Sequence, residues 1–388
     1  MYDMFLKDSD DEDEDEWFYD SIKRYKQLRM FDFENVIHQI ELTDWKTICV
    51  AGKHKSGKYE ILELSLPEKL TVAASHEGLV KNCDLKMRSG GFTSAPVAQV
   101  RALWNQRKIL VSERDEAGVS VYNLGVNDTD LVTKAASLTC ELIAPRIALN
   151  NQDLVLLAAR NCKDIIAIDL NANKNVYKVS EPEVLKGFEP CFMSESLAAI
   201  CERNNGTIVL HDIRAAKMCG SFLPGKRNKE DKTTGALWTT RSSYERNSAY
   251  GNVGNSDSKL GLVSTFGNIL ICDLRNLSEP ICDVDIGKII NPHPQGQEFD
   301  LQLPLLNFSP DNSGEVSLSG FDENVYIYNT SSSDKFKTIF VHDGHKRQSN
   351  SATSCHVTSH AWYRENIMIS ASENSSLHCW QFIPNSSS

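Results

Sequence analysis

Four histidines lie close together near the end of the chain, and histidine is the commonest metal ligand in proteins. They are His342, His345, His356 and His360. A structural zinc site also needs cysteines or carboxylates, and no Cys or carboxylate in this stretch has ligand spacing. The eleven cysteines form no Cys-x-x-Cys pair, and several fall inside apolar stretches, where cysteine acts as a small buried hydrophobe. The sequence therefore predicts intracellular free thiols and no metal.

A second stretch comes within one residue of a phosphate-binding loop. It reads Gly52-Lys53-His54-Lys55-Ser56-Gly57-Lys58-Tyr59. The loop signature requires a Ser or Thr after its lysine, to hold magnesium, and then a helix. Tyr59 stands at the hydroxyl position, and the alternating residues 60–64 predict a strand. We interpret the stretch as a hairpin turn with basic side chains, and we expect no nucleotide and no other cofactor.

The motifs of common catalytic sites are absent from the sequence. It has no Gly-x-Ser-x-Gly elbow, no His-Glu-x-x-His and no dinucleotide glycine fingerprint. A formal net charge of −11 over 388 residues disfavours nucleic-acid binding, which needs a basic face. No apolar run approaches the length of a membrane span. We therefore expect a non-enzymatic protein whose partners are proteins, with no direct nucleic acid and no membrane.

Most of the negative charge lies in one block near the start of the chain. Within nine positions it holds eight carboxylates and one serine: Asp8, Ser9, Asp10, Asp11, Glu12, Asp13, Glu14, Asp15 and Glu16. Such a block repels itself, so residues 1–16 are expected to form a disordered tail. The tail either keeps the protein soluble or docks on a basic patch of a partner. In the second case Ser9 is a candidate site for an acidic-directed kinase.

An amphipathic helix is predicted directly after this block, over residues 17–29. Apolar side chains recur there at helical spacing, with basic residues between them: Trp17, Phe18, Ile22, Tyr25 and Leu28. One interpretation is that the helix packs on the rim of the folded domain. The other is that Trp17 and Phe18 are anchors that insert into a groove of a partner.

A basic segment, opposite in charge to the acidic block, lies in the middle of the chain. Its candidate partner-binding residues are Lys226, Arg227, Lys229 and Lys232. Residues 241–258 follow, rich in Ser, Asn and Gly, and this composition predicts a long exposed loop. The segment is either a plain solvent-exposed loop or a surface for an acidic partner or the chain's own acidic tail. Trp238 is expected to mark the next inner strand.

An internal repeat predicts the fold that must carry these features. Seven apolar stretches end in an acidic residue or its amide at intervals of 43 to 61 residues, at Glu63, Asn123, Asp169, Asp212, Asp273, Asn329 and Gln381. Propeller repeats of about 40–45 residues supply four strands each, and longer intervals require loop insertions. We predict an all-β, seven-bladed β-propeller over residues 30–383, monomeric, with a disordered end at 384–388.

The ring must also be closed, because an open blade exposes a row of unpaired backbone groups. Residues 31–33 and 36–40 alternate in the manner of strands, and we expect them to supply the outer strand of the seventh blade. The pair Gly90-Gly91 predicts a tight turn that leads into the second blade.

The repeats resemble WD-repeat blades, with Asn374 and Gln381 in place of aspartates in the last one. The order of features is similar to that of the WD repeat-containing protein 73 family. It includes the Trp-led helix, Val50-Ala51-Gly52, Gly90-Gly91-Phe92, Ser319-Gly320-Phe321-Asp322 and the ending from Ser370 to Trp380. Within this resemblance, His345 after Gly344 matches a Gly-His dipeptide whose imidazole ties the outer loop to the polar network of its blade.

The resemblance implies a cytoplasmic scaffold that accompanies subunits 9 and 11 of the Integrator RNA-cleavage complex. It also implies, as an alternative, a regulator of microtubule organisation at the spindle. Microtubule surfaces are acidic and repel a chain of charge −11, so this second role is expected to be indirect. The expected location is the cytoplasm, with the spindle and its poles in mitosis.

Overall fold

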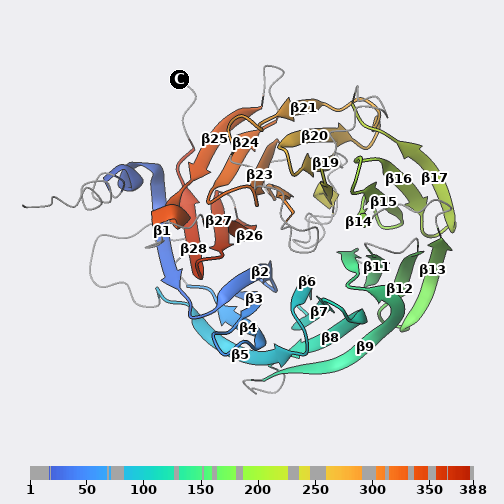
Figure 1. Ribbon diagram of the computed structural model, residues 1–388, viewed down its shortest axis with the longest axis horizontal. Helices are drawn as coiled ribbons and strands as arrows, with labels where there is room; N and C mark the ends of the chain where they lie inside the picture. Colours follow the sequence, from blue (N-terminus) through green and yellow to red (C-terminus); the bar gives the residue numbers. More distant parts are fainter. Residues whose placement is uncertain are drawn as a thin grey trace, which may run out of the picture.

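The computed structural model is a ring of seven four-stranded antiparallel sheets (Figure 1). It describes residues 17–384 apart from 18, 68–69, 71–82, 126–130, 151–152, 160–163, 181–186, 226–235, 245–258, 291–302, 311–313, 331–335, 348–354 and 365. The predicted seven-bladed, all-β propeller is confirmed. Within the described ranges, no helix is long and apolar enough to cross a membrane.

Each blade runs from an inner strand beside the channel to an outer strand at the rim. Blade 1 holds β2 (Val36–Leu42), β3 (Thr47–Lys53), β4 (Tyr59–Ser65) and β5 (Lys86–Thr93), and blade 2 holds β6 (Val97–Leu103), β7 (Lys108–Glu113), β8 (Ala117–Leu124) and β9 (Val132–Ile143). Blade 3 holds β10 (Arg146–Leu149), β11 (Leu154–Ala158), β12 (Asp164–Asp169) and β13 (Lys174–Ser180), and blade 4 holds β14 (Phe188–Phe192), β15 (Leu197–Glu202), β16 (Ile208–Asp212) and β17 (Lys217–Phe222).

Blade 5 holds β18 (Trp238–Ser242), β19 (Lys259–Ser264), β20 (Asn268–Asp273) and β21 (Cys282–Asp285). Blade 6 holds β22 (Leu305–Phe308), β23 (Glu315–Ser319), β24 (Val325–Asn329) and β25 (Lys337–His342), and the short helix α3 (Gly344–Arg347) follows it. Blade 7 holds β26 (Val357–Arg364), β27 (Ile367–Ser372), β28 (Ser376–Phe382) and, as its outer strand, β1 (Tyr25–Asp32).

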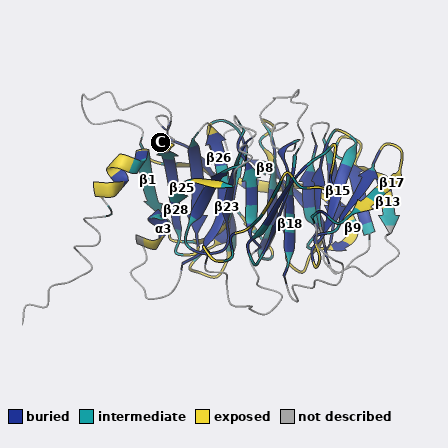
Figure 2. Ribbon diagram, turned by 90° about the horizontal axis from the view of Figure 1, so that it is seen from above, coloured by how far each residue is buried: buried dark blue, intermediate teal, exposed yellow. Residues whose placement is uncertain are grey.

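The seven repeat stretches found in the sequence are the third strands of the seven blades, and Trp238 begins an inner strand as expected. The middle strands are buried on both faces, because a neighbouring blade covers each face (Figure 2). Seven hydrophobic clusters fill the spaces between blades, and each draws on two adjacent blades. The core is therefore distributed around the ring.

The start of the chain closes the ring, as predicted. Strand β1 pairs antiparallel with β28, from Tyr25 opposite Phe382 to Asp32 opposite Ser376. Two boundaries were wrong. Residues 36–40 belong to β2, the inner strand of blade 1, and helical structure ends at residue 24 rather than 29. The exposed edge of β28 needs a pairing partner, and this tertiary demand outweighs the helical spacing of Tyr25 and Leu28.

The pair Gly90-Gly91 does not form the predicted turn but lies inside β5. The start of β9 crosses β5 here, with a parallel bridge between Gly90 and Leu131. A Cβ added to Gly91 would lie 2.5 Å from the backbone oxygen of Val132, whereas the nearest atom to one added to Gly90 would be in the side chain of Leu62, at 3.2 Å. Glycine is required at position 91 because two backbones approach closely.

We therefore expect Gly91→Ala to lower the free energy of unfolding by about 1–3 kcal/mol, the usual range for overpacking. Gly90→Ala is the matched control and should have the smaller effect, because the Leu62 side chain can move aside. Thermal unfolding followed by circular dichroism measures both variants. Equal losses of stability would contradict this account of the contact between blades 1 and 2.

Candidate functional site

A buried polar network joins the strands of the closing blade. The Trp380 indole N–H donates to Ser370 Oγ at 3.0 Å, and the same hydroxyl lies 2.8 Å from His345 Nε2. His345 Nδ1 lies 2.6 Å from Ser376 Oγ. Asn374 takes the aspartate position, and its amide donates to the His345 carbonyl at 3.1 Å. The role expected for His345, tying the outer loop to its blade, is confirmed.

Two further histidines connect this network to the first strand. The Tyr25 hydroxyl lies 2.7 Å from His342 Nδ1, and His342 Nε2 lies 3.0 Å from His378 Nδ1. His378 stacks on His345 with ring centroids 3.9 Å apart. Burial raises the pKa of Tyr25, and the Asp343 carboxylate adds to this effect, so the hydroxyl that bonds His342 stays protonated.

The nitrogens of His342, His345 and His378 lie close enough together to consider a metal, within 4.8 Å of one another. However, both ring nitrogens of His345 contact serine hydroxyls, and both of His342 contact Tyr25 and His378. A metal ion would have to replace these hydrogen bonds, so the arrangement fits a hydrogen-bonded network better than a ligand set. Sequence reasoning missed His378 and grouped His360 with this cluster. His360 instead binds Ser317 and Ser319 of blade 6.

Burial keeps the three clustered imidazoles neutral. It lowers the pKa of His345 to about 3 and the pKa values of His342 and His378 well below the ordinary value, with the neighbouring histidines adding to the effect. Arg24 also faces His342 and lowers its pKa further. The unfolded chain takes up protons near pH 6.5 and the folded chain does not. These groups therefore contribute stability above pH 6.5 that is lost as the pH falls.

We predict that the melting temperature falls as the pH is lowered from 7.5 to 5.0, with a cost of up to about 1.4 kcal/mol per pH unit for each histidine. His342→Gln should lower the melting temperature at pH 7.5 and flatten its pH dependence. His54 provides the control, because it is only half-buried and its hydrogen bonds stay within its own turn, to Ser56; His54→Gln should leave the pH dependence unchanged. An unchanged pH slope in the His342 variant would contradict the prediction.

The N-terminal segment is fastened to the ring at Asp343, between β25 and α3. The Trp17 indole N–H donates to the Asp343 carboxylate at 3.0 Å, and the Arg24 guanidinium pairs with the same carboxylate at 3.2 Å. This contact agrees with the interpretation in which the helix packs on the rim. Tyr19 and Ile22 are 65% and 60% exposed, so they form the outward side of this segment.

Most of the sequence-predicted partner-binding residues lie outside the described part of the chain. These are Asp8, Ser9, Asp10, Asp11, Glu12, Asp13, Glu14, Asp15, Glu16, Phe18, Lys226, Arg227, Lys229 and Lys232. The stretch that resembled a phosphate-binding loop is the hairpin turn between β3 and β4, as predicted. Gly57 has the positive φ of 83° that this turn needs, and no helix follows.

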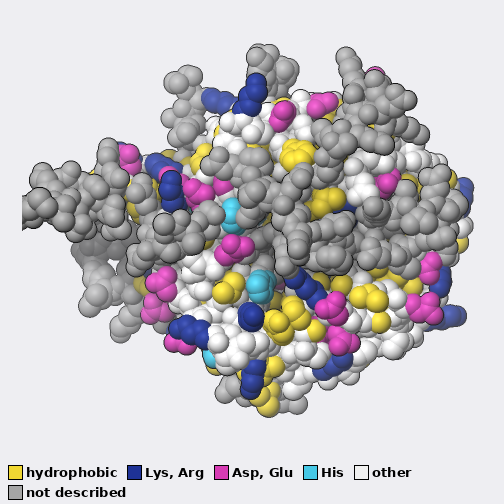
Figure 3. Space-filling model, viewed as in Figure 1, with side chains coloured by type: hydrophobic (Ala, Val, Ile, Leu, Met, Phe, Trp, Pro, Cys, Tyr) yellow, Lys and Arg dark blue, Asp and Glu magenta, His cyan; other side chains and the backbone are white. Residues whose placement is uncertain are grey.

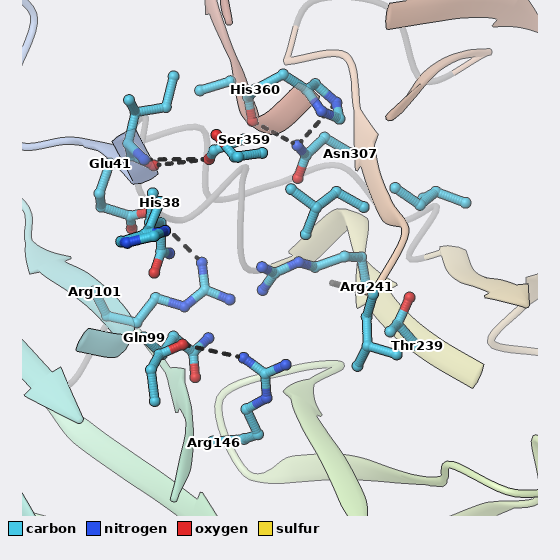
Figure 4. A pocket seen from close by; sticks show the side chains of 18 of the residues that line it. His38, Glu41, Gln99, Arg101, Arg146, Thr239, Arg241, Asn307, Ser359 and His360 are labelled. Atoms are coloured by element: carbon cyan, nitrogen blue, oxygen red, sulfur yellow. Dashed lines mark hydrogen bonds and ion pairs between the residues drawn. The ribbon is translucent and has the colours of Figure 1, made fainter. Parts of the chain in front are cut away.

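The channel of the ring holds a cavity of about 570 Å³, lined mainly by the inner strands. Figure 4 shows the guanidinium groups of Arg101, Arg146 and Arg241 converging in it from β6, β10 and β18. Arg101 lies 3.8 Å from Glu41, and Arg146 lies 2.9 Å from Glu189. Sequence reasoning missed this cluster because each arginine belongs to a different repeat.

Figure 3 shows acidic and basic side chains scattered over one face of the ring, among the side chains drawn in colour. Inside the channel, His38 lies near basic groups. Burial lowers its pKa, and the charges of Arg114 and Lys53 lower it further. The described lining of the channel thus holds charges of both signs, with four arginines beside Glu41, Glu189 and Glu373.

No known protein-family model matches the chain. It is similar along nearly its whole length to vertebrate proteins named Integrator complex assembly factor WDR73. Identity to the Danio rerio protein is 29%, over 97% of this chain and 98% of the relative. The Xenopus laevis protein is 26% identical over 94% of this chain and 96% of its own length. The Homo sapiens protein is 26% identical, with 95% and 97% covered.

These alignments cover 94–97% of this chain and 96–98% of each relative, which is enough to extend over all seven blades. The ring also places the repeat stretches and the Gly-His network where the sequence resemblance requires them. Over nearly its whole length the chain is therefore similar to the WD repeat-containing protein 73 of four vertebrates, at 26–29% identity.

Proposed function

We propose that the protein is a non-enzymatic assembly factor for the Integrator complex that binds the subunits 9 and 11 of its cleavage module in the cytoplasm. The observation that carries this proposal is the end-to-end similarity to relatives named as Integrator complex assembly factors. A propeller suits this role. Its strands pair with one another inside the blades, so its loops and appended segments are the parts that can bind partners.

The polar groups of the described residues support a scaffold over an enzyme. The three clustered histidines are neutral and take part in hydrogen bonds within the closing blade. Glu63 is buried and is held by Ser89 at 2.8 Å and Arg107 at 2.9 Å, an arrangement that joins blades 1 and 2. The spindle role stays a prediction, since the names of the relatives do not include it.

The N-terminal segment is our candidate for the partner contact. It combines the acidic block at residues 8–16 with a helix whose Tyr19 and Ile22 side chains are exposed. Trp17 is engaged by Asp343 in the free protein, so its use as an anchor requires the helix to leave the rim. We propose that the block steers the encounter with a basic surface and that aromatic and aliphatic side chains hold the complex.

The test measures association and dissociation rates of the purified full chain with the purified pair of subunits 9 and 11. Deleting residues 8–16 should lower the on-rate roughly tenfold at low salt. The loss should shrink at 1 M salt, where the Debye length is about 3 Å instead of about 10 Å at 0.1 M. Trp17→Ala with Phe18→Ala should instead raise the off-rate with little dependence on salt.

Met218→Ala with Val176→Ala is the matched control, because both side chains are exposed and lie on the distant blades 3 and 4. It should leave both rates unchanged. Absence of any binding between the full chain and the two subunits would refute the proposed function. Binding that is indifferent to all changes in the N-terminal segment would move the interface to the loops of the propeller.

A further inference from the structure

Aromatic side chains from three neighbouring blades meet on one face of the ring, in the turns that join inner strands to second strands. Trp45 lies in the turn between β2 and β3, and Trp104 in the turn between β6 and β7. Their rings meet edge to face, with centroids 5.4 Å apart. At the end of β26, the Arg364 guanidinium lies 5.3 Å from the ring centroids of both Trp45 and Tyr363. We call these four residues the turn cluster.

Hydrogen bonds across the blade boundaries hold these turns in place. The Tyr363 hydroxyl donates to the carbonyl of Trp45 at 2.5 Å, which ties blade 7 to blade 1. The backbone N–H of Asn105 donates to the carbonyl of Thr43 at 3.2 Å, which ties blade 2 to blade 1. A surface fixed in this way loses little conformational entropy when a ligand binds, so the turn cluster is preorganised.

The residue types and exposure of the turn cluster are those of a protein contact. Tryptophan, tyrosine and arginine are the residues enriched at interface hot spots. Tyr363 is buried, whereas the two tryptophans are half-buried and Arg364 is exposed. A guanidinium carries several N–H donors. Within the described part of the chain, Arg364 forms neither an ion pair nor a hydrogen bond, so these donors remain for a ligand.

The chemistry of the turn cluster indicates what binds there. A guanidinium pairs with a carboxylate through two parallel hydrogen bonds, and neighbouring indole rings accept an apolar side chain. RNA bases also stack on aromatic rings, but their phosphates need a basic groove. Here Asp44 precedes Trp45 in its turn, and Glu41 lines the same channel wall as Trp104. These carboxylates repel phosphates, so a protein segment fits the surface better than RNA.

The turn that follows Arg364 is connected to the N-terminal segment. The N–H of Phe382, at the end of β28, donates to the carbonyl of Asn366 in this turn at 3.1 Å. The N–H of the next residue, Ile383, donates to the carbonyl of Arg24 at 2.9 Å. The end of the N-terminal helix and the turn cluster therefore lie on adjacent parts of the molecule, where one partner can contact both.

We propose that the turn cluster is a second contact surface for the protein partner, and that the partner segment on it places a carboxylate at Arg364 and an apolar side chain at Trp45 and Trp104. This inference rests on the proposed function, from which it takes the partner. It adds the surface that is used and the chemistry that the partner must present. Because the N-terminal segment and the turn cluster are rigidly linked, the two contacts reinforce each other.

The experiment measures binding of the full-length chain to the purified pair of Integrator subunits 9 and 11. Arg364→Gln should raise the off-rate about tenfold, the loss expected for a charge-assisted hydrogen bond. Arg364→Glu should weaken binding further, because a like charge then faces the partner's carboxylate. Trp104→Ala should raise the off-rate by about tenfold or more, as the loss of a hot-spot aromatic does.

Matched variants separate this contact from general charge and from misfolding. Arg214 is an exposed arginine in blade 4, after β16, so Arg214→Gln and Arg214→Glu repeat both charge changes and should leave the rates unchanged. Arg364→Lys keeps the charge but loses the planar fork, so its off-rate should lie between those of the natural chain and Arg364→Gln. Melting temperatures of all variants show whether the ring is intact.

The outcomes distinguish this surface from the function on which it rests. If the natural chain binds the two subunits and Arg364→Glu and Trp104→Ala bind equally well, the surface is wrong and the proposed function stands. An equal loss in Arg214→Glu would also overturn the surface. If the natural chain does not bind, both proposals fail. A short oligouridine that binds the natural chain but not Trp104→Ala would overturn the assignment of this surface to a protein.

Discussion

The pairing of β1 with β28 is the interaction on which the rest of the structure depends. Each blade hides its faces against two neighbours, so the hydrophobic clusters on both sides of blade 7 need that blade to be complete. Tyr25 contributes three contacts at once: backbone pairing with Phe382, packing against Phe340 and a hydrogen bond to His342. Covering the edge of β28 with a strand from the far end of the chain completes the seventh blade and so closes the ring of packed sheets.

A second constraint is the spacing of the inner strands around the channel. Neighbouring inner strands belong to different sheets, and polar side chains link one strand to the next. The Gln39 amide bonds both backbone groups of Val100, and the Gln99 amide does the same with Ile147. These links satisfy backbone groups that would otherwise lack partners, and they fix the spacing of the inner strands. Arg101 and Arg146 lie next to these linked positions, so the links that close the wall also hold the arginine cluster in place.

The sequence allowed the repeat, the blade count and the closure of the ring to be predicted, because the third strands share a pattern that local reasoning can find. Prediction from the sequence was wrong where the same residue pattern is compatible with two different structures. Tyr25 and Leu28 satisfy helical spacing, yet their place in β1 is decided by β28, more than 300 residues away. The sequence analysis places Gly91 in a turn, but glycine is needed there because the backbone of Val132 crosses it. That contact comes from another blade, so the local sequence does not show it. The arginine cluster was missed for the same reason, since its members come from three repeats.

The N-terminal segment changes from a solvent-exposed helix to a buried strand between residues 24 and 25. Residues 17 and 19–24 are helical, with exposed Tyr19 and Ile22 and contacts to Asp343 from Trp17 and Arg24. From Tyr25 it is a buried strand. Those contacts lie at the surface, where a single ion pair contributes at most about 1 kcal/mol, whereas the strand is held by backbone pairing and apolar burial. A partner can therefore lift the helix from the rim at small cost while β1 keeps the ring closed.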